Sequence, residues 1–306
     1  MIKESMILRL SFLFIIVLAV LTAVAAPQDT DSQADAAYQQ KNWPEAARLY
    51  SILAQNENGN GLYFYRLGVA EQSQGHYEAA LAAFNQAKSK GTPAQIVDYN
   101  LACVYARMNR HEEAITQLQD ALAKGFSQPD QLATDPDLES LRSDAKFSQI
   151  VQQAKRNQEP CEYNADNRQF DFWIGDWRVS RTSGGPQVGT SHIEKAIGGC
   201  VIWENWTSLG SSYFGKSYNA FNQNLKRWEQ FWVDNQGGMI HFFGGLKDGT
   251  MDFYTDDVPQ PDGSKLRRHL QFFNLGPDKV RQFSQGSTDE GKTWNVEYDF
   301  TYVRGK

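Results

Sequence analysis

The spacing of apolar residues changes once along the chain, near residue 169. Before this point, alanine and aromatic residues recur at the spacing of amphipathic helices. After it, aromatic and β-branched residues form short runs interrupted by glycine turns, as in β-strands. The change falls in the aromatic stretch 167–177. The pattern therefore predicts a two-domain α+β chain, with a helical first half and a β-sheet second half.

The helical half contains an internal repeat with a period of 34 residues. One position holds small residues and two others hold bulky ones, in the aligned sets Ala46, Ala80 and Ala114; Tyr50, Phe84 and Leu118; Trp43, Tyr77 and His111. Small residues let two helices approach closely, and bulky ones fill the groove between neighbouring hairpins. The stretch 65–80, YRLGVAEQSQGHYEAA, resembles the tetratricopeptide repeat, and the resemblance covers about residues 32–125. It implies an α-solenoid of helical hairpins, with a degenerate leading helix in the first copy.

One more helix is predicted after the repeats. The segment 135–137, Asp-Pro-Asp, is typical of a helix start. The apolar residues that follow are Leu138, Leu141, Phe147 and Ile150. Such a helix would cap the open end of the stack. Residues 32–156 are therefore predicted to form the array together with its capping helix.

The resemblance to tetratricopeptide arrays implies a protein or peptide partner in a concave groove. In this sequence the groove residues would be Tyr65, Val69, Tyr99, Cys103 and Arg107. The alternative is an array that only packs against its own second domain. The Lys/Asn clamp that some arrays use for C-terminal carboxylates is missing, because Tyr65 and Tyr99 occupy its leading positions. No enzymatic role is implied for this half.

Residues 157–168 are predicted to form a linker, because this segment is polar, contains Pro160 and shows no periodicity. In an oxidising compartment, Cys161 and Cys200 could pin the start of the second domain to its strand. The alternative is that these two cysteines and Cys103 are unpaired, partly buried thiols. The sequence has no CxxC motif or zinc-ligand set, so no metal site is predicted.

From Trp177 to Arg304 the sequence predicts about ten short strands with turn signals between them. No helix long enough for a crossover separates the strands, so an antiparallel sheet is expected. Such a sheet, aromatic on both faces, would protect its edges by closing into a barrel. Residues 169–306 are therefore predicted to form a β-barrel. On its last strand, alternation assigns one face to Trp294, Val296, Tyr298, Phe300 and Tyr302.

The first predicted strand opens with Gly175 and Trp177, directly after a short aromatic turn. A GxW pair at this place resembles the lipocalin (calycin) signature. The resemblance implies that the tryptophan closes one end of the barrel, often beneath an arginine from near the end of the domain, for which Arg304 is the candidate. The wider pattern FDFWIGDW, with the later WEQFWVD, resembles an uncharacterised bacterial lipocalin-like family that also occurs fused to tetratricopeptide repeats. That family implies no catalytic residue.

Residues 287–294, STDEGKTW, match the Asp-box motif SxDxGxTW. Sialidases carry several such boxes, so a glycosidase has to be considered. The Asp-box is itself a folded hairpin that lies away from the sialidase active site, and a single copy does not make a propeller. A structural role is therefore expected, in which Asp289 accepts hydrogen bonds from turn amides.

Polar residues are predicted to meet inside the barrel. Alternation along neighbouring strands would place Glu204, Asn219 and Gln230 side by side. The tryptophans predicted to surround them are Trp206, Trp228 and Trp232. A few convergent polar groups among aromatic residues are typical of a small-molecule site. The alternatives are a polar network that only fills the barrel, or the opposite facing, with these groups in water.

The sequence favours an exported, non-catalytic protein that binds a partner through its repeats and a small, mainly apolar ligand in its barrel. One alternative is an enzyme with Glu204 as general acid or base, and another is a structural scaffold. No cofactor is predicted. A haem would need a strand histidine as its ligand, and His192, His241 and His269 are assigned ordinary packing or surface roles. A net charge of −6 argues against nucleic acid as a partner.

Residues 1–25 are predicted to be a signal peptide. Lys3 and Arg9 precede the apolar run 10–25, which ends in the small-x-small pattern of a signal-peptidase site, Ala-Val-Ala. The alternative is an uncleaved membrane anchor, because a run of this length can span a bilayer. Cleavage would export the protein, and the periplasm is its expected location.

The first test concerns this segment. Sequencing of the N-terminus of protein purified from its native host is expected to begin at Ala26, because the apolar run ends in the cleavage pattern. A retained initiator methionine would favour the anchor instead.

Overall fold

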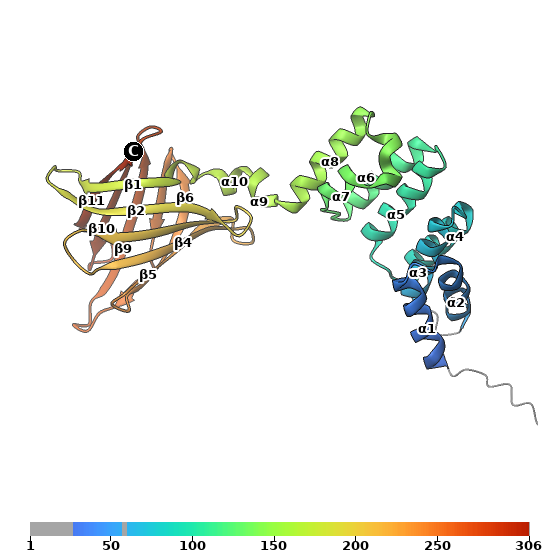
Figure 1. Cartoon of the computed structure of the whole chain (residues 1–306). Coiled ribbons are helices and arrows are strands. Elements are labelled where there is room, and N and C mark those ends of the chain that lie inside the picture. The colour runs from blue at the N-terminus through green and yellow to red at the C-terminus, as the bar shows by residue number, and fades with distance from the viewer. Residues whose placement is uncertain (1–26, 57–59, 306) are drawn as a thin grey trace, which may run out of the picture. The chain divides into compact units, whose positions relative to one another are not determined.

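The computed structural model describes residues 27–56 and 60–305 (Figure 1). The predicted signal peptide lies outside these residues. The chain divides into two compact units, one up to Ala121 and one from Leu122 onward. This division lies upstream of the predicted linker at 157–168. That the linker marks a domain boundary stays a prediction.

The first unit consists of helical hairpins, and this confirms the predicted α-solenoid of tetratricopeptide repeats. The helices are α1 (Pro27–Gln39), α2 (Trp43–Gln55), α3 (Gly61–Ser73), α4 (Tyr77–Ser89), α5 (Ala94–Arg107) and α6 (His111–Ala123), whose end reaches into the second unit. The leading helix of the first hairpin, which is degenerate in sequence, is formed over 13 residues.

The small residues of the repeat lie where the helices approach most closely. Ala46, Ala80 and Ala114 are completely buried. A Cβ atom on Gly68 would lie 2.7 Å from the ring of Phe84, so only glycine fits between α3 and α4 at this position. The small residues of the repeat therefore mark the positions at which neighbouring helices are in contact.

The segment predicted as one capping helix forms two helices. A 3₁₀ helix, η1 (Pro136–Leu141), is followed by α8 (Ala145–Gln158), and α7 (Pro129–Thr134) precedes both. The break comes at Asp144, whose side chain accepts a hydrogen bond from the backbone N–H of Lys146 and so starts a new helix. The predicted linker is also partly helical, with α9 (Pro160–Tyr163) and α10 (Ala165–Arg168).

The β half is a closed antiparallel barrel of ten strands, as predicted. The strands are β1 (Gly175–Arg181), β2 (Gln187–Ala196), β3 (Val201–Ser208), β4 (Phe214–Asn222), β5 (Arg227–Asp234), β6 (Met239–Lys247), β7 (Thr250–Tyr254), β9 (Lys265–Asn274), β10 (Lys279–Ser287) and β11 (Asn295–Arg304). The pairs β1–β11 and β9–β10 close the ring, and the two-residue strand β8 (Val258–Pro259) pairs with β9 alone. Closure protects the strand edges, as expected for a barrel.

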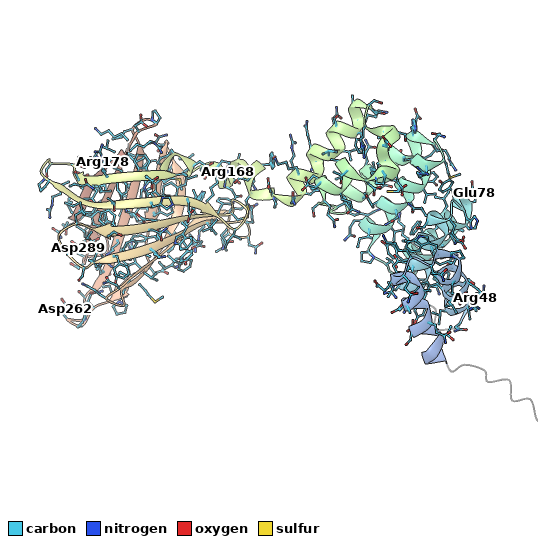
Figure 2. All side chains as sticks on the ribbon, in the orientation of Figure 1. Arg48, Glu78, Arg168, Arg178, Asp262 and Asp289 are labelled. Carbon is cyan, nitrogen blue, oxygen red and sulfur yellow. A yellow bond between two sulfur atoms is a disulfide. The ribbon has the colours of Figure 1, made fainter. Side chains whose placement is uncertain are left out.

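One end of the barrel is sealed by the chain that enters it. Phe170 and the short 3₁₀ helix η2 (Asp171–Trp173) insert aromatic rings into the core, and Phe170 stacks on Trp173 at 4.9 Å between ring centroids. Figure 2 labels Arg168 at this end, with Asp262 and Asp289 at the other. The aromatic turn before β1 is thus an internal plug.

The predicted partnership of Trp177 and Arg304 is confirmed. The Arg304 guanidinium lies over the Trp177 ring at 4.5 Å and donates hydrogen bonds to the carbonyl oxygens of Ile174 and Pro277. Gly175 has a φ of +140° and faces the same guanidinium, so the glycine of the GxW pair makes room for the arginine.

The single Asp-box is a structural hairpin. Asp289 accepts hydrogen bonds from the backbone N–H and the hydroxyl of Thr293, and the Trp294 indole donates to the Gly291 carbonyl at 3.0 Å. The Thr293 backbone N–H, followed by the hydroxyls of Thr293 and Ser287, lowers the pKa of Asp289 to about 2. With its lone pairs engaged in the turn, the carboxylate holds the β10–β11 connection in place.

Substitution of Gly175 tests the sealed end. Gly175→Ala is expected to destabilise the barrel by about 1–3 kcal/mol, because the added Cβ would clash with Nη1 of Arg304 in a backbone conformation that alanine disfavours. Urea unfolding followed by tryptophan fluorescence measures this loss. Gly245→Ala is the control, since its Cβ would meet only Trp228, at 4.0 Å. Equal losses in both variants would contradict the assigned role of Gly175.

Candidate functional site

A cavity of about 350 Å³ lies inside the barrel. Its walls are mainly aromatic and aliphatic side chains, with a few polar groups between them. The lining residues are Glu204, Trp206, Ser208, Tyr213, Gln230, Trp232, Ile240, Phe242, Leu270, Gln282, Tyr298, Phe300 and Tyr302. This volume and this lining are typical of sites for small organic molecules.

The strand register decides which polar groups meet in the cavity. Glu204 on β3 lies opposite Ile193 on β2 and Ser217 on β4. The residue is 2% exposed, and its two carboxyl oxygens accept hydrogen bonds from the hydroxyls of Ser191 and Ser217, each at 2.9 Å. Glu204 therefore lies inward, with each oxygen engaged by one serine.

Burial raises the pKa of Glu204 from 4.5 to about 7, although the hydrogen bonds from Ser191 and Ser217 act in the opposite direction. Its carboxyl therefore changes charge near neutral pH. A group of this kind can accept or release a proton, or can bind a ligand in a pH-dependent way.

Of the six residues predicted to form the pocket, four line the cavity: Glu204, Trp206, Gln230 and Trp232. Asn219 is buried but does not line it. It pairs with Ile202 rather than Glu204 and donates to the Ile202 carbonyl and to Ser217. The prediction set Asn219 between Glu204 and Gln230. The register confirms that Asn219 lies opposite Gln230 but places Ser217 opposite Glu204.

Trp228 also lies outside the cavity lining. Its indole donates to the side chain of Gln169 at 3.1 Å, and its ring packs edge-on against Phe170 in the sealed end. The prediction followed the alternation along β5 correctly, but alternation does not show how far along the barrel axis each tryptophan lies. Trp228 and Trp232 lie four residues apart, so one belongs to the plug and the other to the cavity.

Several lining residues were not predicted as site residues. Tyr298, Phe300 and Tyr302 come from β11, and their shared face was visible in the sequence as alternation. That alternation breaks at Glu297, where the register between β10 and β11 shifts. Val296 is consequently 61% exposed and does not share the face of Tyr298, which corrects the predicted face of this strand.

Two polar atoms in this region have no hydrogen-bond partner. They are the side-chain oxygens of Gln230, which lines the cavity, and of Asn219, next to it. Both residues are almost fully buried, at 3% and 0% exposure. A buried acceptor without a donor is costly, and Gln230 is the one of these two residues that lines the cavity.

The three histidines of the barrel lie on its outer face, each bonded to a carboxylate. His192 contacts Asp176 at 2.6 Å, and His241 contacts Glu229 at 2.7 Å. The hydrogen bond that His192 donates to the Asp176 carboxylate raises the pKa of the histidine. His269 bonds to Asp252, and Gln285 engages its other ring nitrogen at 2.9 Å. None of these histidines is among the cavity lining residues.

The proposed groove residues of the helical half differ in exposure. Tyr65 and Val69 on α3 are half-buried, and Arg107 on α5 is exposed. Tyr99 is only 4% exposed and Cys103 only 1% exposed. Most of α5 is buried, so the expectation that Tyr99 and Cys103 offer contact surface to a partner is corrected.

Cys161 and Cys200 form a disulfide, with 5.0 Å between their Cα atoms, and the third cysteine, Cys103, takes no part in a disulfide. The bond joins α9 to the turn before β3. The Glu162 carboxylate adds ion pairs to Arg168 at 3.1 Å and to Lys195 at 2.7 Å. These links fix the segment before the aromatic plug against the barrel.

Comparison with known proteins identifies the helical half. The tetratricopeptide repeat family matches residues 32–96, so the chain carries tetratricopeptide repeats. The family described as A/B hydrolase-like, N-terminal domain, matches residues 66–162. In this chain residues 66–162 form helices and turns and contain no strand.

Similarity to named proteins is partial. A chloroplastic protein from Arabidopsis thaliana is 35% identical over 91 residues, which cover 29% of this chain and only 27% of that protein. PcrH from Pseudomonas aeruginosa is 20% identical, covering 45% of this chain and 98% of its own, with a TM-score of 0.32. The S-type phycobiliprotein lyase CPES from Guillardia theta is 14% identical, covering 48% of this chain and 96% of its own, with a TM-score of 0.31.

The titration of Glu204 predicts a pH-dependent stability. A carboxyl with a raised folded-state pKa binds its proton more tightly in the folded protein, so stability falls as pH rises from 4.5 to about 7. Glu204→Gln removes this loss and is expected to stabilise the barrel by up to about 3 kcal/mol more at pH 8 than at pH 4. Urea unfolding at the two pH values measures the difference.

The control is Glu194→Gln, which removes the same charge from an exposed position on β2. This variant is expected to change stability by less than about 0.5 kcal/mol at either pH. If Glu204→Gln shifts stability equally at pH 4 and pH 8, the carboxyl does not titrate as described.

Proposed function

We propose that this protein is an exported, non-catalytic binding protein, with a small, mainly apolar ligand in the barrel and a protein partner on the helical repeats. The barrel proposal depends on one observation, the cavity of about 350 Å³ with its mainly aromatic walls. A purely structural scaffold is less well supported, because close-packed interiors leave few voids of this size.

The helical half supports the second part of the proposal. Tetratricopeptide hairpins stack into solenoids whose extended concave surfaces are used for binding. The proposed contacts are Tyr65 and Val69 on α3 and Arg107 on α5, which keep part of their surface exposed. These residues lie on the leading helices of successive hairpins, so one extended segment of a partner can touch all three.

Export is supported by two independent features. The apolar run with its cleavage pattern is one, and the disulfide between Cys161 and Cys200 is the other. Disulfides persist in oxidising compartments such as the periplasm and are rare in the cytosol. Within the part of the chain that the structure describes, no helix is long and apolar enough to cross a membrane.

An enzyme acting inside the barrel is the second candidate, favoured by the pKa of about 7 at Glu204. Among the described residues that line the cavity, however, there is no histidine, cysteine or second carboxyl to work with it. The lining residues are therefore sufficient for binding, whereas acid–base catalysis would require a further group beside Glu204.

Binding of a neutral apolar fluorophore tests the proposal. N-phenyl-1-naphthylamine is expected to bind the full chain with a rise in fluorescence, because the cavity removes the fluorophore from water. Trp232→Ala is expected to weaken this binding about tenfold, since it deletes an aromatic wall of the cavity.

Phe231→Ala is the matched control. Phe231 is the neighbour of Trp232 on β5, but it is 48% exposed and lies on the outer face. Its loss is expected to leave fluorophore binding unchanged. Absence of binding to the wild type, or equal weakening in both variants, would contradict a binding site inside the barrel.

A further inference from the structure

The cavity also indicates what kind of ligand it accepts. Building on the proposed binding function, we propose that the barrel ligand is an organic cation, a small molecule with an apolar body and a protonated amine that pairs with the Glu204 carboxylate. The inference depends on three properties of the cavity: its charge, its free hydrogen-bond acceptors and its aromatic walls.

The charge of the cavity is one-sided. Among the described residues that line it, Glu204 carries the one carboxyl group, and there is no lysine, arginine or histidine. Arg268 on β9 shares the alternation of the lining residue Leu270, but it is already paired with Glu297 at 2.9 Å. An ionised Glu204 therefore has no cation among the lining residues as its partner.

The other titratable groups that face Glu204 do not compensate for it. Tyr298 and Tyr302 on β11 and Tyr213 before β4 have a pKa raised by burial, so they are uncharged near neutral pH. Ser191 and Ser217 on the flanking strands are neutral donors. Among the lining residues, an incoming ligand would meet one negative charge, that of Glu204, between neutral groups.

A second carboxylate adds to the negative potential. Asp234, at the end of β5, accepts a hydrogen bond from the hydroxyl of the lining residue Tyr213 at 3.2 Å. The backbone N–H of Gly238, followed by that of Gln236, holds the pKa of Asp234 below its usual range, so this group is ionised. Negative charge near the cavity attracts cations and repels anions.

The free acceptors match an ammonium group. Each Glu204 oxygen accepts one serine hydroxyl and keeps further lone-pair capacity, while the side-chain oxygen of Gln230 has no partner. An ammonium group offers three N–H donors and no acceptor. It would satisfy the Gln230 oxygen and neutralise Glu204, two groups whose burial is otherwise costly.

The walls suit a cation with an apolar body. Trp206 stacks on Phe300 at 5.9 Å between ring centroids, and Phe300 stacks on Tyr298 at 4.9 Å, which gives a continuous aromatic wall. The faces of tryptophan and tyrosine rings attract cations, most strongly where water is excluded. Ile240 and Leu270 supply aliphatic surface for the rest of the molecule.

An apolar carboxylic acid, the main alternative, fits less well. Its carboxylate would place a second negative charge beside Glu204 with no basic lining side chain to hold either. A neutral alcohol would fill the cavity and could donate one hydrogen bond, but it would leave the charge of Glu204 unpaired. The amine is the head group that uses both the charge and the acceptors.

Three ligands that differ only in their head group test the inference. Calorimetry and tryptophan fluorescence on the full chain at pH 7.5 compare 4-phenylbutylamine, 4-phenylbutanol and 4-phenylbutyrate. The amine is expected to bind about tenfold or more tightly than the alcohol, and the carboxylate more weakly than both. In Glu204→Gln the preference for the amine should disappear while the alcohol still binds.

Proton release gives a second readout on the wild-type protein. At pH 6.0, titrations in two buffers of different ionisation enthalpy are expected to show that amine binding releases protons, because the bound cation drives Glu204 to ionise. The alcohol should release none. This measurement does not depend on whether the Glu204→Gln variant folds.

The outcomes separate the two proposals. Equal binding of amine and alcohol, tighter binding of the carboxylate, an amine preference that survives in Glu204→Gln, or amine binding without proton release would each overturn the organic cation and leave a binding barrel. If none of the three ligands and no neutral fluorophore binds, the proposed binding function fails as well.

Discussion

The insertion of Phe170 and Trp173 into one end of the barrel is the contact on which the rest of this domain depends. Their stacked rings meet Phe272 and Trp228, and Trp177 lies against Tyr302 beneath the Arg304 guanidinium. A ten-stranded barrel has more interior than its own inward side chains fill. The plug takes up the space at one end, and the space left over is the cavity.

This arrangement explains why a carboxyl can be kept inside the barrel. Glu204 lies beyond the plug, where the cavity begins, and two serine hydroxyls engage its oxygens. Its burial opposes ionisation and costs stability at neutral pH. A residue that contributed only to packing would carry no such cost, and the organic cation proposed above would offset it by pairing with the Glu204 carboxylate.

The links ahead of the plug have a matching role. The Cys161–Cys200 disulfide and the ion pairs of Glu162 hold the entering segment against the barrel. The plug lies at the start of the barrel domain, and the ends of domains fray unless they are held in place. Without these anchors its aromatic rings could therefore leave the core. The sealed end is therefore covalently and electrostatically fixed, and the opposite end, near Asp262 and Asp289, is formed by the turns between strands (Figure 2).

The sequence by itself determined what depends on local periodicity. The 34-residue repeat specified the helical hairpins, because each small residue marks a close helix contact, and the glycine-punctuated aromatic runs specified an antiparallel barrel of about ten strands. Alternation also assigned Glu204 and Gln230 to one side of their strands, and the GxW pair identified Trp177 and Arg304 as neighbours.

Only the tertiary structure decided the register of the strands, the level of each side chain along the barrel axis and which side chains are buried. The pairing of β3 with β4 set Ser217 rather than Asn219 opposite Glu204, and a bulge at Glu297 turned Val296 outward. Trp228 packs against Phe170 of the plug and Trp232 lines the cavity, although both share a face of β5. Tyr99 is buried although its repeat position predicted a contact surface. Periodicity fixes which way a side chain points, but which neighbours it meets depends on residues far away in the chain.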